Sequence, residues 1–97
     1  MTVRQSVRDF VDLGPLPDSS ASIEMIAKHE ACLTRITRPV TDEEAEMLVR
    51  CFGPDDCFGL AQTLMTIIET APGGTPLKER PAETANEWVM RLWERAH

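Results

Sequence analysis

Four residues of this chain could bind a metal ion: His29, Cys32, Cys51 and Cys57. The three cysteines could also react as thiolates. His29 and Cys32 are one helical turn apart, so their side chains can share one face of a helix. A structural zinc site needs four close ligands, however, and the usual Cys-x-x-Cys pairs are absent. We therefore favour a partly buried histidine that donates to a backbone carbonyl, and the metal site remains the alternative interpretation.

Cys51 and Cys57 bracket the short segment CFGPDDC, a spacing that could allow a disulfide or a redox switch. Two small packing residues explain the same pair. A helix start near Cys57 would lower the pKa of its thiol, but Asp55 and Asp56 would raise it, so no reactive nucleophile is predicted. No Ser, His and Asp show a recognisable catalytic arrangement, and Tyr is absent. We predict that the protein is not an enzyme and has no cofactor.

Acidic residues gather in the middle of the chain, where six of the 16 Asp and Glu residues fall between positions 42 and 56. Arg50 is the only base among them. Acids in the first turns of helices cap free amides and complement the helix dipole, which gives the cluster a structural explanation. The functional explanation is a negative surface that attracts a basic partner. The residues predicted to form it are Asp42, Glu43, Glu46, Asp55 and Asp56. The spacing typical of calcium loops is absent, so no metal is predicted there.

Composition limits the class of protein. The 97 residues are enough for one domain, 1–97, and 42% of them are apolar. A net charge of −6 disfavours binding to nucleic acid and to anionic membranes. The N-terminal residues have no apolar run, so no signal peptide is predicted, and no segment is long and apolar enough to span a membrane. Three cysteines without paired spacing agree with a reducing compartment, and we expect a cytoplasmic, bacterial protein.

Hydrophobic periodicity predicts an all-α fold, a compact orthogonal or up-down bundle of four to five helices. Thr41 and Glu44 have the spacing of a capping box, which marks the start of the third helix. Gly53 is expected to end that helix in a left-handed conformation, and Pro54 to prevent its continuation. The fourth helix is the most apolar and is expected at the centre of the bundle, with Phe58 on its apolar face. The predicted ranges are about 3–12, 20–36, 42–52, 55–71 and 82–96.

The segment from Phe52 to Gly73, FGPDDCFGLAQTLMTIIETAPG, resembles short, functionally uncharacterised proteins of actinobacterial type. The segment LGPLP, from Leu13 to Pro17, fits the same resemblance. No activity is attached to such proteins, so the resemblance implies no functional residue. By size, acidity and helix content the chain is also similar to colicin-type immunity proteins, which implies inhibitory binding only as an analogy between folds.

These observations lead to one main functional prediction and two alternatives. The main prediction is a small, acidic, non-catalytic interaction domain that binds a basic protein partner, with inhibition of that partner as one form of the function. The first alternative is a small metal- or thiol-dependent site built from His29 and the cysteines. The second is a homodimer with a structural role.

Overall fold

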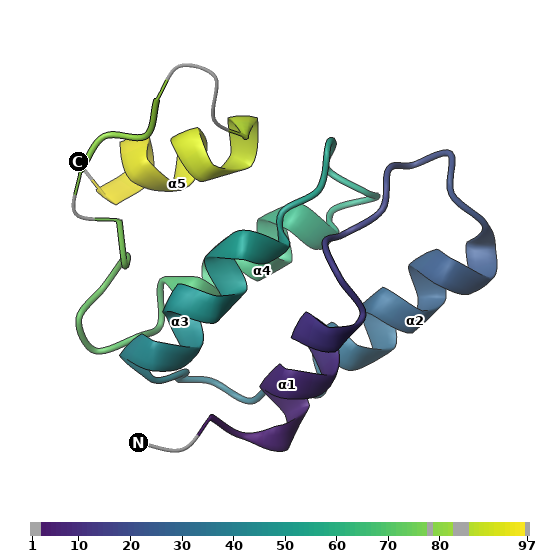
Figure 1. The fold of residues 1–97 in the computed structure, drawn as a ribbon, viewed down its shortest axis with the longest axis horizontal. Coiled ribbons are helices and arrows are strands. Elements are labelled where there is room, and N and C mark those ends of the chain that lie inside the picture. The colour runs from purple at the N-terminus through teal and green to yellow at the C-terminus, as the bar shows by residue number, and fades with distance from the viewer. Residues whose placement is uncertain (1–2, 78, 83–85, 97) are drawn as a thin grey trace.

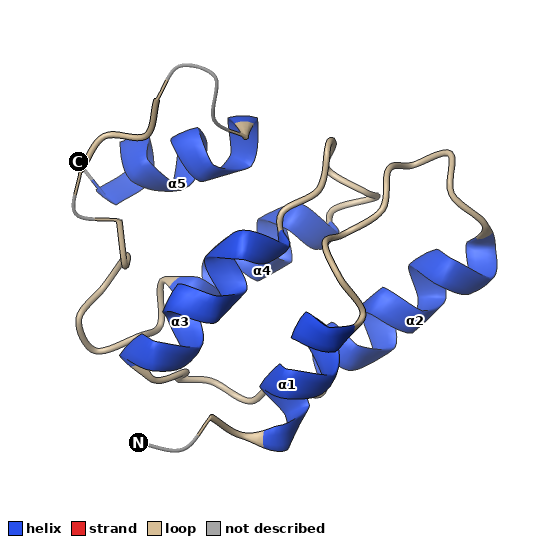
Figure 2. Cartoon of the chain, in the orientation of Figure 1, coloured by secondary structure: helices blue, strands red, loops and turns tan. Residues whose placement is uncertain are grey.

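The computed structural model describes residues 3–77, 79–82 and 86–96, and within these it confirms the all-α prediction (Figures 1 and 2). No strand occurs in the described ranges. None of the helices found there has the length and apolar character needed to cross a membrane. The elements in chain order are α1 (Gln5–Asp12), α2 (Ile23–Thr34), α3 (Asp42–Leu48), the 3₁₀ helix η1 (Val49–Cys51), α4 (Leu60–Ile68) and α5 (Glu87–Ala96).

The helices pack around one hydrophobic core to which each of the five α-helices contributes. Helix α1 packs against α2 and α3, α3 packs against α4, and α5 packs against α4. The side chains at the centre of these contacts are fully buried: Phe10, Leu33, Leu48, Leu64 and Leu92. Helix α4 contributes six buried residues, in agreement with its predicted central place.

The capping box at the start of α3 is confirmed. The Thr41 hydroxyl accepts a hydrogen bond from the Glu44 amide at 3.1 Å, and the Glu44 carboxylate accepts one from the Thr41 amide at 2.8 Å. Two of the amides that a helix start leaves unpaired are satisfied in this way. Helix α3 ends at Leu48, earlier than predicted, because its last turn tightens into η1 before the chain leaves at Phe52.

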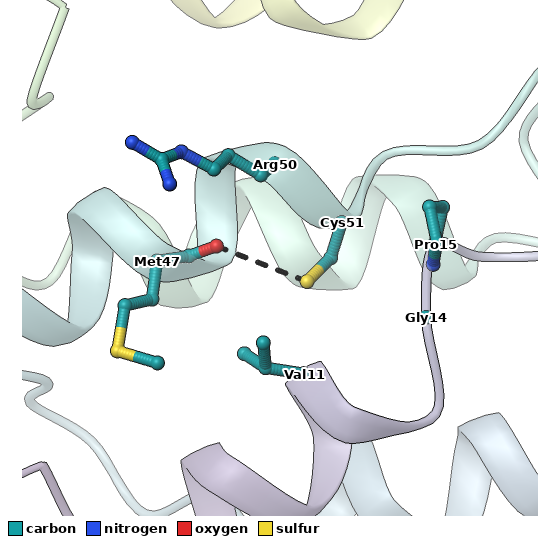
Figure 3. Close-up of a pocket in the computed structure, with 6 residues that line it drawn as sticks. All are labelled: Val11, Gly14, Pro15, Met47, Arg50 and Cys51. Atoms are coloured by element: carbon teal, nitrogen blue, oxygen red, sulfur yellow. Dashed lines mark hydrogen bonds between the residues drawn. The ribbon is translucent and has the colours of Figure 1, made fainter.

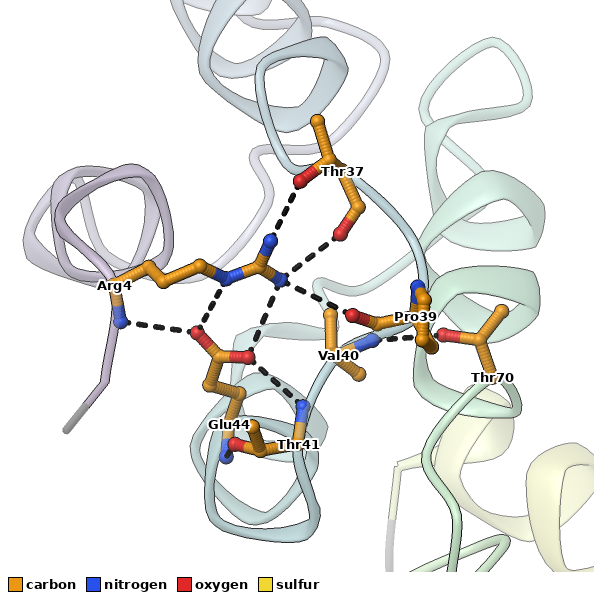
Figure 4. A network of polar contacts seen from close by, with 7 residues as sticks. All are labelled: Arg4, Thr37, Pro39, Val40, Thr41, Glu44 and Thr70. Atoms are coloured by element: carbon orange, nitrogen blue, oxygen red, sulfur yellow. Dashed lines mark hydrogen bonds and ion pairs between the residues drawn. The ribbon is translucent and has the colours of Figure 1, made fainter. Parts of the chain in front are cut away.

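An ion pair that joins α1 to α3 fixes the position of this helix start (Figure 4). The Arg4 guanidinium donates to Glu44 at 3.0 Å and 3.2 Å and to the hydroxyl and carbonyl of Thr37 at 2.6 Å and 2.9 Å. The Glu44 side chain is completely buried. Burial alone would raise the pKa of Glu44, but hydrogen bonds from Arg4 and Thr41 lower it to about 2. Glu44 is therefore a structural residue rather than part of the acidic surface.

The prediction that Gly53 adopts a left-handed conformation is wrong. The described glycines with positive φ are Gly14, Gly59 and Gly74. Gly53 is needed for a different reason, because a methyl group on its Cα would overlap the carbonyl oxygen of Leu16. The segment after α1 therefore crosses directly over the end of η1, where the Leu16 amide donates to the Cys51 carbonyl at 2.8 Å.

The predicted start of the fourth helix at residue 55 is also wrong, since α4 begins at Leu60. Three consecutive residues before it have left-handed φ values: 48° at Cys57, 55° at Phe58 and 91° at Gly59. A right-handed helix cannot include such a run. The Asp55 carboxylate stabilises this turn by accepting from the Cys57 amide at 2.9 Å. Consequently Phe58, which was expected in the core, is 75% exposed.

The remaining helices are shorter than predicted. Ser22 caps α2 by accepting from the Met25 amide at 3.2 Å, so the two serines before it belong to a turn. Residues 83–85 of the predicted last helix lie outside the described ranges, and α5 begins at Glu87. Asn86 fixes that start, because its side chain accepts from the Trp88 amide and donates to the Gly53 carbonyl, both at 2.8 Å.

Candidate functional site

Three of the five predicted binding acids lie on α3. Glu43 and Glu46 are exposed, and within the described ranges neither carboxylate has an ion-pair or hydrogen-bond partner. Asp42 is also exposed, and its carboxylate accepts from the Gly73 amide at 2.8 Å. Asp42 thus holds the loop after α4 against the start of α3, while Glu43 and Glu46 keep their full capacity to bind a partner.

The other two acids, Asp55 and Asp56, lie in the turn before α4 and are half-buried. Asp55 accepts from the Ser19 amide at 3.0 Å and from the Cys57 amide at 2.9 Å, and the bond from Ser19 lowers the pKa of its carboxyl. The backbone carbonyl of Asp56 accepts from the Ala61 amide at 3.1 Å. Both residues help to shape the turn.

The structure therefore separates the predicted acidic surface into two groups. The contact between Asp42 and Gly73 shows that the start of α3 lies beside the end of α4, so the two helices are antiparallel (Figure 1). The turn with Asp55 and Asp56 lies at the opposite end of α3 and η1. Ten helical residues span about 15 Å. Acids that are close in the sequence thus form one group on α3 and a second group at the far end.

Two shallow hollows border the acids of α3. The first, of about 250 Å³, lies between the start of α3 and the loop after α4, and Asp42, Glu46 and residues 73–76 line it. The second, of about 230 Å³, lies over the outer face of α3 and is lined by Glu43, Glu46, Met47 and Arg50. Glu46 lines both hollows, so the two hollows meet at this residue.

A third hollow, of about 160 Å³, continues this surface toward α1 (Figure 3). Its lining is mainly apolar and consists of Val11, Gly14, Pro15, Met47, Arg50 and Cys51. Met47 and Arg50 also line the hollow over α3, so the acidic and apolar parts meet at these two residues. We define the α3 surface as Asp42, Glu43, Glu46, Met47 and Arg50 with this adjoining hollow.

The three cysteines are free thiols, and two of them are inaccessible. Burial raises the pKa of Cys51 from its ordinary value of 9.0 to about 11. Burial, followed by the negative charges of Asp55, Asp18 and Asp56, raises the pKa of Cys57. Both thiols therefore remain protonated at neutral pH, which disfavours a role as nucleophile or metal ligand.

Thiol labelling tests this description. With Ellman's reagent at pH 8, we expect the half-buried Cys32 to react first, Cys51 to react at least about a hundredfold more slowly, and Cys57 also to react more slowly than Cys32. A pKa of about 11 in place of 9.0 lowers the thiolate fraction of Cys51 by that factor, and burial blocks access further. Unfolding in guanidinium should make all three react at one rate. Rapid reaction of two or three thiols in the folded protein would contradict this account.

His29 is buried on α2, and its surroundings are structural. Its Nδ1 lies 3.0 Å from the carbonyl of Met25, and its ring meets the Phe10 ring edge-on at a centroid distance of 6.3 Å. The Nε2 atom is buried without a hydrogen-bond partner among the described residues. Over the same residues, no three His, Cys, Asp or Glu side chains are arranged to hold a metal ion. The structure thus does not assemble the metal site that His29 and the cysteines suggested.

Comparisons with known proteins add no family to this picture. No protein-family model, no curated protein and no solved structure matches the chain. The function of the chain is therefore inferred from its own residues and their geometry.

The sequence did not predict the place of two residues, Arg4 and Phe58, in the structure. Arg4 was not predicted as the partner of Glu44, because the two residues are 40 positions apart in the sequence and form no local pattern. Phe58 was assigned to the core, because its spacing fits the apolar face of a longer helix. Gly59, directly after it, was the available signal that the helix starts later, because a glycine often marks a left-handed turn.

Proposed function

We propose that this chain is a non-catalytic interaction domain that binds a basic protein partner through the α3 surface. The observation that carries the proposal is the pair of exposed carboxylates at Glu43 and Glu46, which lack partners within the described ranges and border hollows on α3. Exposed acids are fully solvated when free, so ion pairs at the rim of an interface contribute mainly to specificity and association rate.

The adjoining apolar hollow supports the same proposal. Electrostatic attraction alone is screened by salt and gives little geometric selectivity. Val11, Pro15 and Met47 provide an apolar area next to the carboxylates. A partner that presents Lys or Arg side chains next to an apolar side chain would match both parts of the α3 surface. Inhibition by covering a basic active site is one form that this binding could take.

The free thiols agree with a reducing compartment such as the bacterial cytoplasm, where we propose that the domain acts.

Paired substitutions test the proposal. Basic proteins of a bacterial lysate, collected on a cation-exchange resin, are passed over the immobilised chain, and the affinity of each captured protein is then measured. We expect the double variant E43Q/E46Q to bind about tenfold more weakly or worse, because two attractive charges are removed from the interface. The affinity of the unchanged chain should also fall as salt is raised.

The control is E30Q/E94Q, which removes two exposed carboxylates from α2 and α5. Each variant changes the net charge by the same amount, so general electrostatic attraction would weaken both equally. We expect less than a twofold loss for the control. Equal losses in the two variants, or undiminished binding by E43Q/E46Q, would contradict a specific role for the α3 surface.

A further inference from the structure

Three large hydrophobic side chains are strongly exposed in the described part of the chain: Phe58 at 75%, Ile23 at 86% and Met25 at 43%. Phe58 lies in the turn between η1 and α4, and the other two lie in the first turn of α2. An exposed phenylalanine loses the stabilisation that its burial would provide. Its ring therefore adds nothing to the hydrophobic core and is open to contact from outside.

The backbone at Phe58 makes the exposure more notable. Its φ of 55° lies in the left-handed region, which is unfavourable for a residue with a Cβ atom and which glycine adopts freely. The turn is nevertheless well fixed, because the Cys57 side chain before it is fully buried and Asp55 accepts from the Cys57 amide. A side chain held outward on a fixed turn loses little entropy when a partner covers it.

The turn is also tied to the segment that leads into α2. The Ser19 amide donates to Asp55 at 3.0 Å, and the Asp18 carboxylate accepts from the amide and hydroxyl of Ser20 at 2.9 Å and 2.6 Å. Ile23 begins α2 three residues later. In Figure 1 the start of α2 and the turn before α4 lie on the same side of the molecule, toward the upper right. The hydrogen bond from Ser19 to Asp55 thus places the segment that leads into α2, and its exposed first turn, next to the turn that carries Phe58.

Three carboxylates lie close to the turn that carries Phe58. Asp18, Asp55 and Asp56 all act on the thiol of Cys57, the residue next to Phe58, and help to raise its pKa. Among the described residues, none of these three carboxylates forms an ion pair. A second copy of this chain, with its net charge of −6, and an anionic lipid surface would both be repelled. A basic protein surface with an apolar pocket would be attracted.

We propose that Phe58, with Ile23 and Met25 at the start of α2, is the apolar anchor by which the domain binds an apolar groove bordered by Lys or Arg on a protein partner. This inference rests on the proposed function for the basic character of the partner, but it places the main apolar contact outside the α3 surface. The segment between α1 and α2 borders both regions, since Gly14 and Pro15 line the hollow beside α3 and Ser19 is bonded to the turn. One partner can therefore contact both.

Fluorine NMR tests the inference with a defined probe. The chain has three phenylalanines, and Phe10 and Phe52 are buried, so fluorophenylalanine labelling places a single reporter at the surface. The probe is an amphipathic peptide of about 14 Lys and Leu residues, and the control is the same pattern with Glu in place of Lys. We expect the Lys/Leu peptide to shift the Phe58 resonance and leave the other two unchanged. The Glu/Leu peptide should shift none.

Substitutions separate this inference from the proposed function and from an effect on folding. Phe58→Gly should weaken peptide binding at least about tenfold, with the melting temperature unchanged or raised, because glycine removes the backbone strain. Phe58→Trp should retain binding. The variant E43Q/E46Q should still show the Phe58 shift, so failure of the α3 surface would leave this result intact.

The inference is overturned if the Lys/Leu peptide does not move the Phe58 resonance or if both peptides move it equally. A shift on adding phosphatidylcholine vesicles, or on raising the protein concentration alone, would assign Phe58 to a membrane or to a second copy and would also overturn it.

Discussion

Replacing Glu44 by glutamine is expected to lower the free energy of unfolding at pH 7 by about 2–4 kcal/mol. The substitution removes the charge of a fully buried carboxylate that neutralises the partly exposed Arg4 guanidinium, and an amide cannot accept both guanidinium bonds equally well. Urea denaturation measures the change. The control is Glu43→Gln on the same helix, an exposed carboxylate without a partner among the described residues, which should cost less than about 0.5 kcal/mol. Equal costs for the two variants would show that the ion pair with Arg4 contributes nothing.

The contribution of Glu44 should also depend on pH in a defined direction. Its ordinary pKa is 4.5, and the folded value is about 2, so the folded protein binds this proton less tightly than the unfolded chain does. The stabilisation, about 3 kcal/mol, is fully present above pH 4.5 and is lost as the pH falls toward 2. The difference in unfolding free energy between the unchanged chain and E44Q should therefore narrow across this interval. A difference that stays constant from pH 5 to pH 2 would contradict the lowered pKa.

Replacing Gly53 by alanine is expected to lower the free energy of unfolding by about 2–4 kcal/mol. The added methyl group would overlap the carbonyl oxygen of Leu16, which is backbone and cannot rotate away. Relief requires the segment after α1 to move from η1, and this would weaken the bond from the Leu16 amide to the Cys51 carbonyl. It would also disturb the bond from Asn86 to the Gly53 carbonyl, which fixes the start of α5.

Gly74→Ala is the matched control for Gly53→Ala. A methyl group at Gly74 would meet no atom within 4 Å, so the only cost arises from its φ of +75°. That cost is about 1–2 kcal/mol. Thermal and urea denaturation of the two variants should therefore rank Gly53→Ala as clearly the more damaging. The reverse order would show that steric contact with Leu16 does not limit how closely the segment after α1 packs against Gly53.

Local patterns in the sequence predicted the helices well where short-range chemistry determines them. The Thr41–Glu44 capping box depends on residues three positions apart, and the structure has both of its hydrogen bonds. The apolar face of α4 was likewise predicted from its periodicity, and six of its residues are buried. Such features depend on one helical turn, so they can be recognised without knowledge of the tertiary fold.

The features that were missed depend on contacts between distant segments. Arg4 and Glu44 meet because α1 packs beside α3, and Gly53 is required because the segment after α1 crosses over it. Asp42 and Asp55 are 13 positions apart in sequence. They nevertheless lie at opposite ends of α3 and η1, because these two consecutive helices separate them. Charge clustering in sequence therefore predicted the acidic character of α3 but not the separation of the acids into two groups.

The central claim is that the α3 surface binds a basic partner. Amide mapping of the complex by NMR is the most direct test of this claim. Two-dimensional NMR spectra of the labelled chain would be recorded without and with the captured basic protein at saturation. The account predicts that the largest changes fall on the amides of residues 42–50 and of the apolar hollow beside them, with further changes at the turn before α4 and only small changes across α5. Changes confined to α5 or the exposed side of α2, with the α3 amides unaffected, would contradict it.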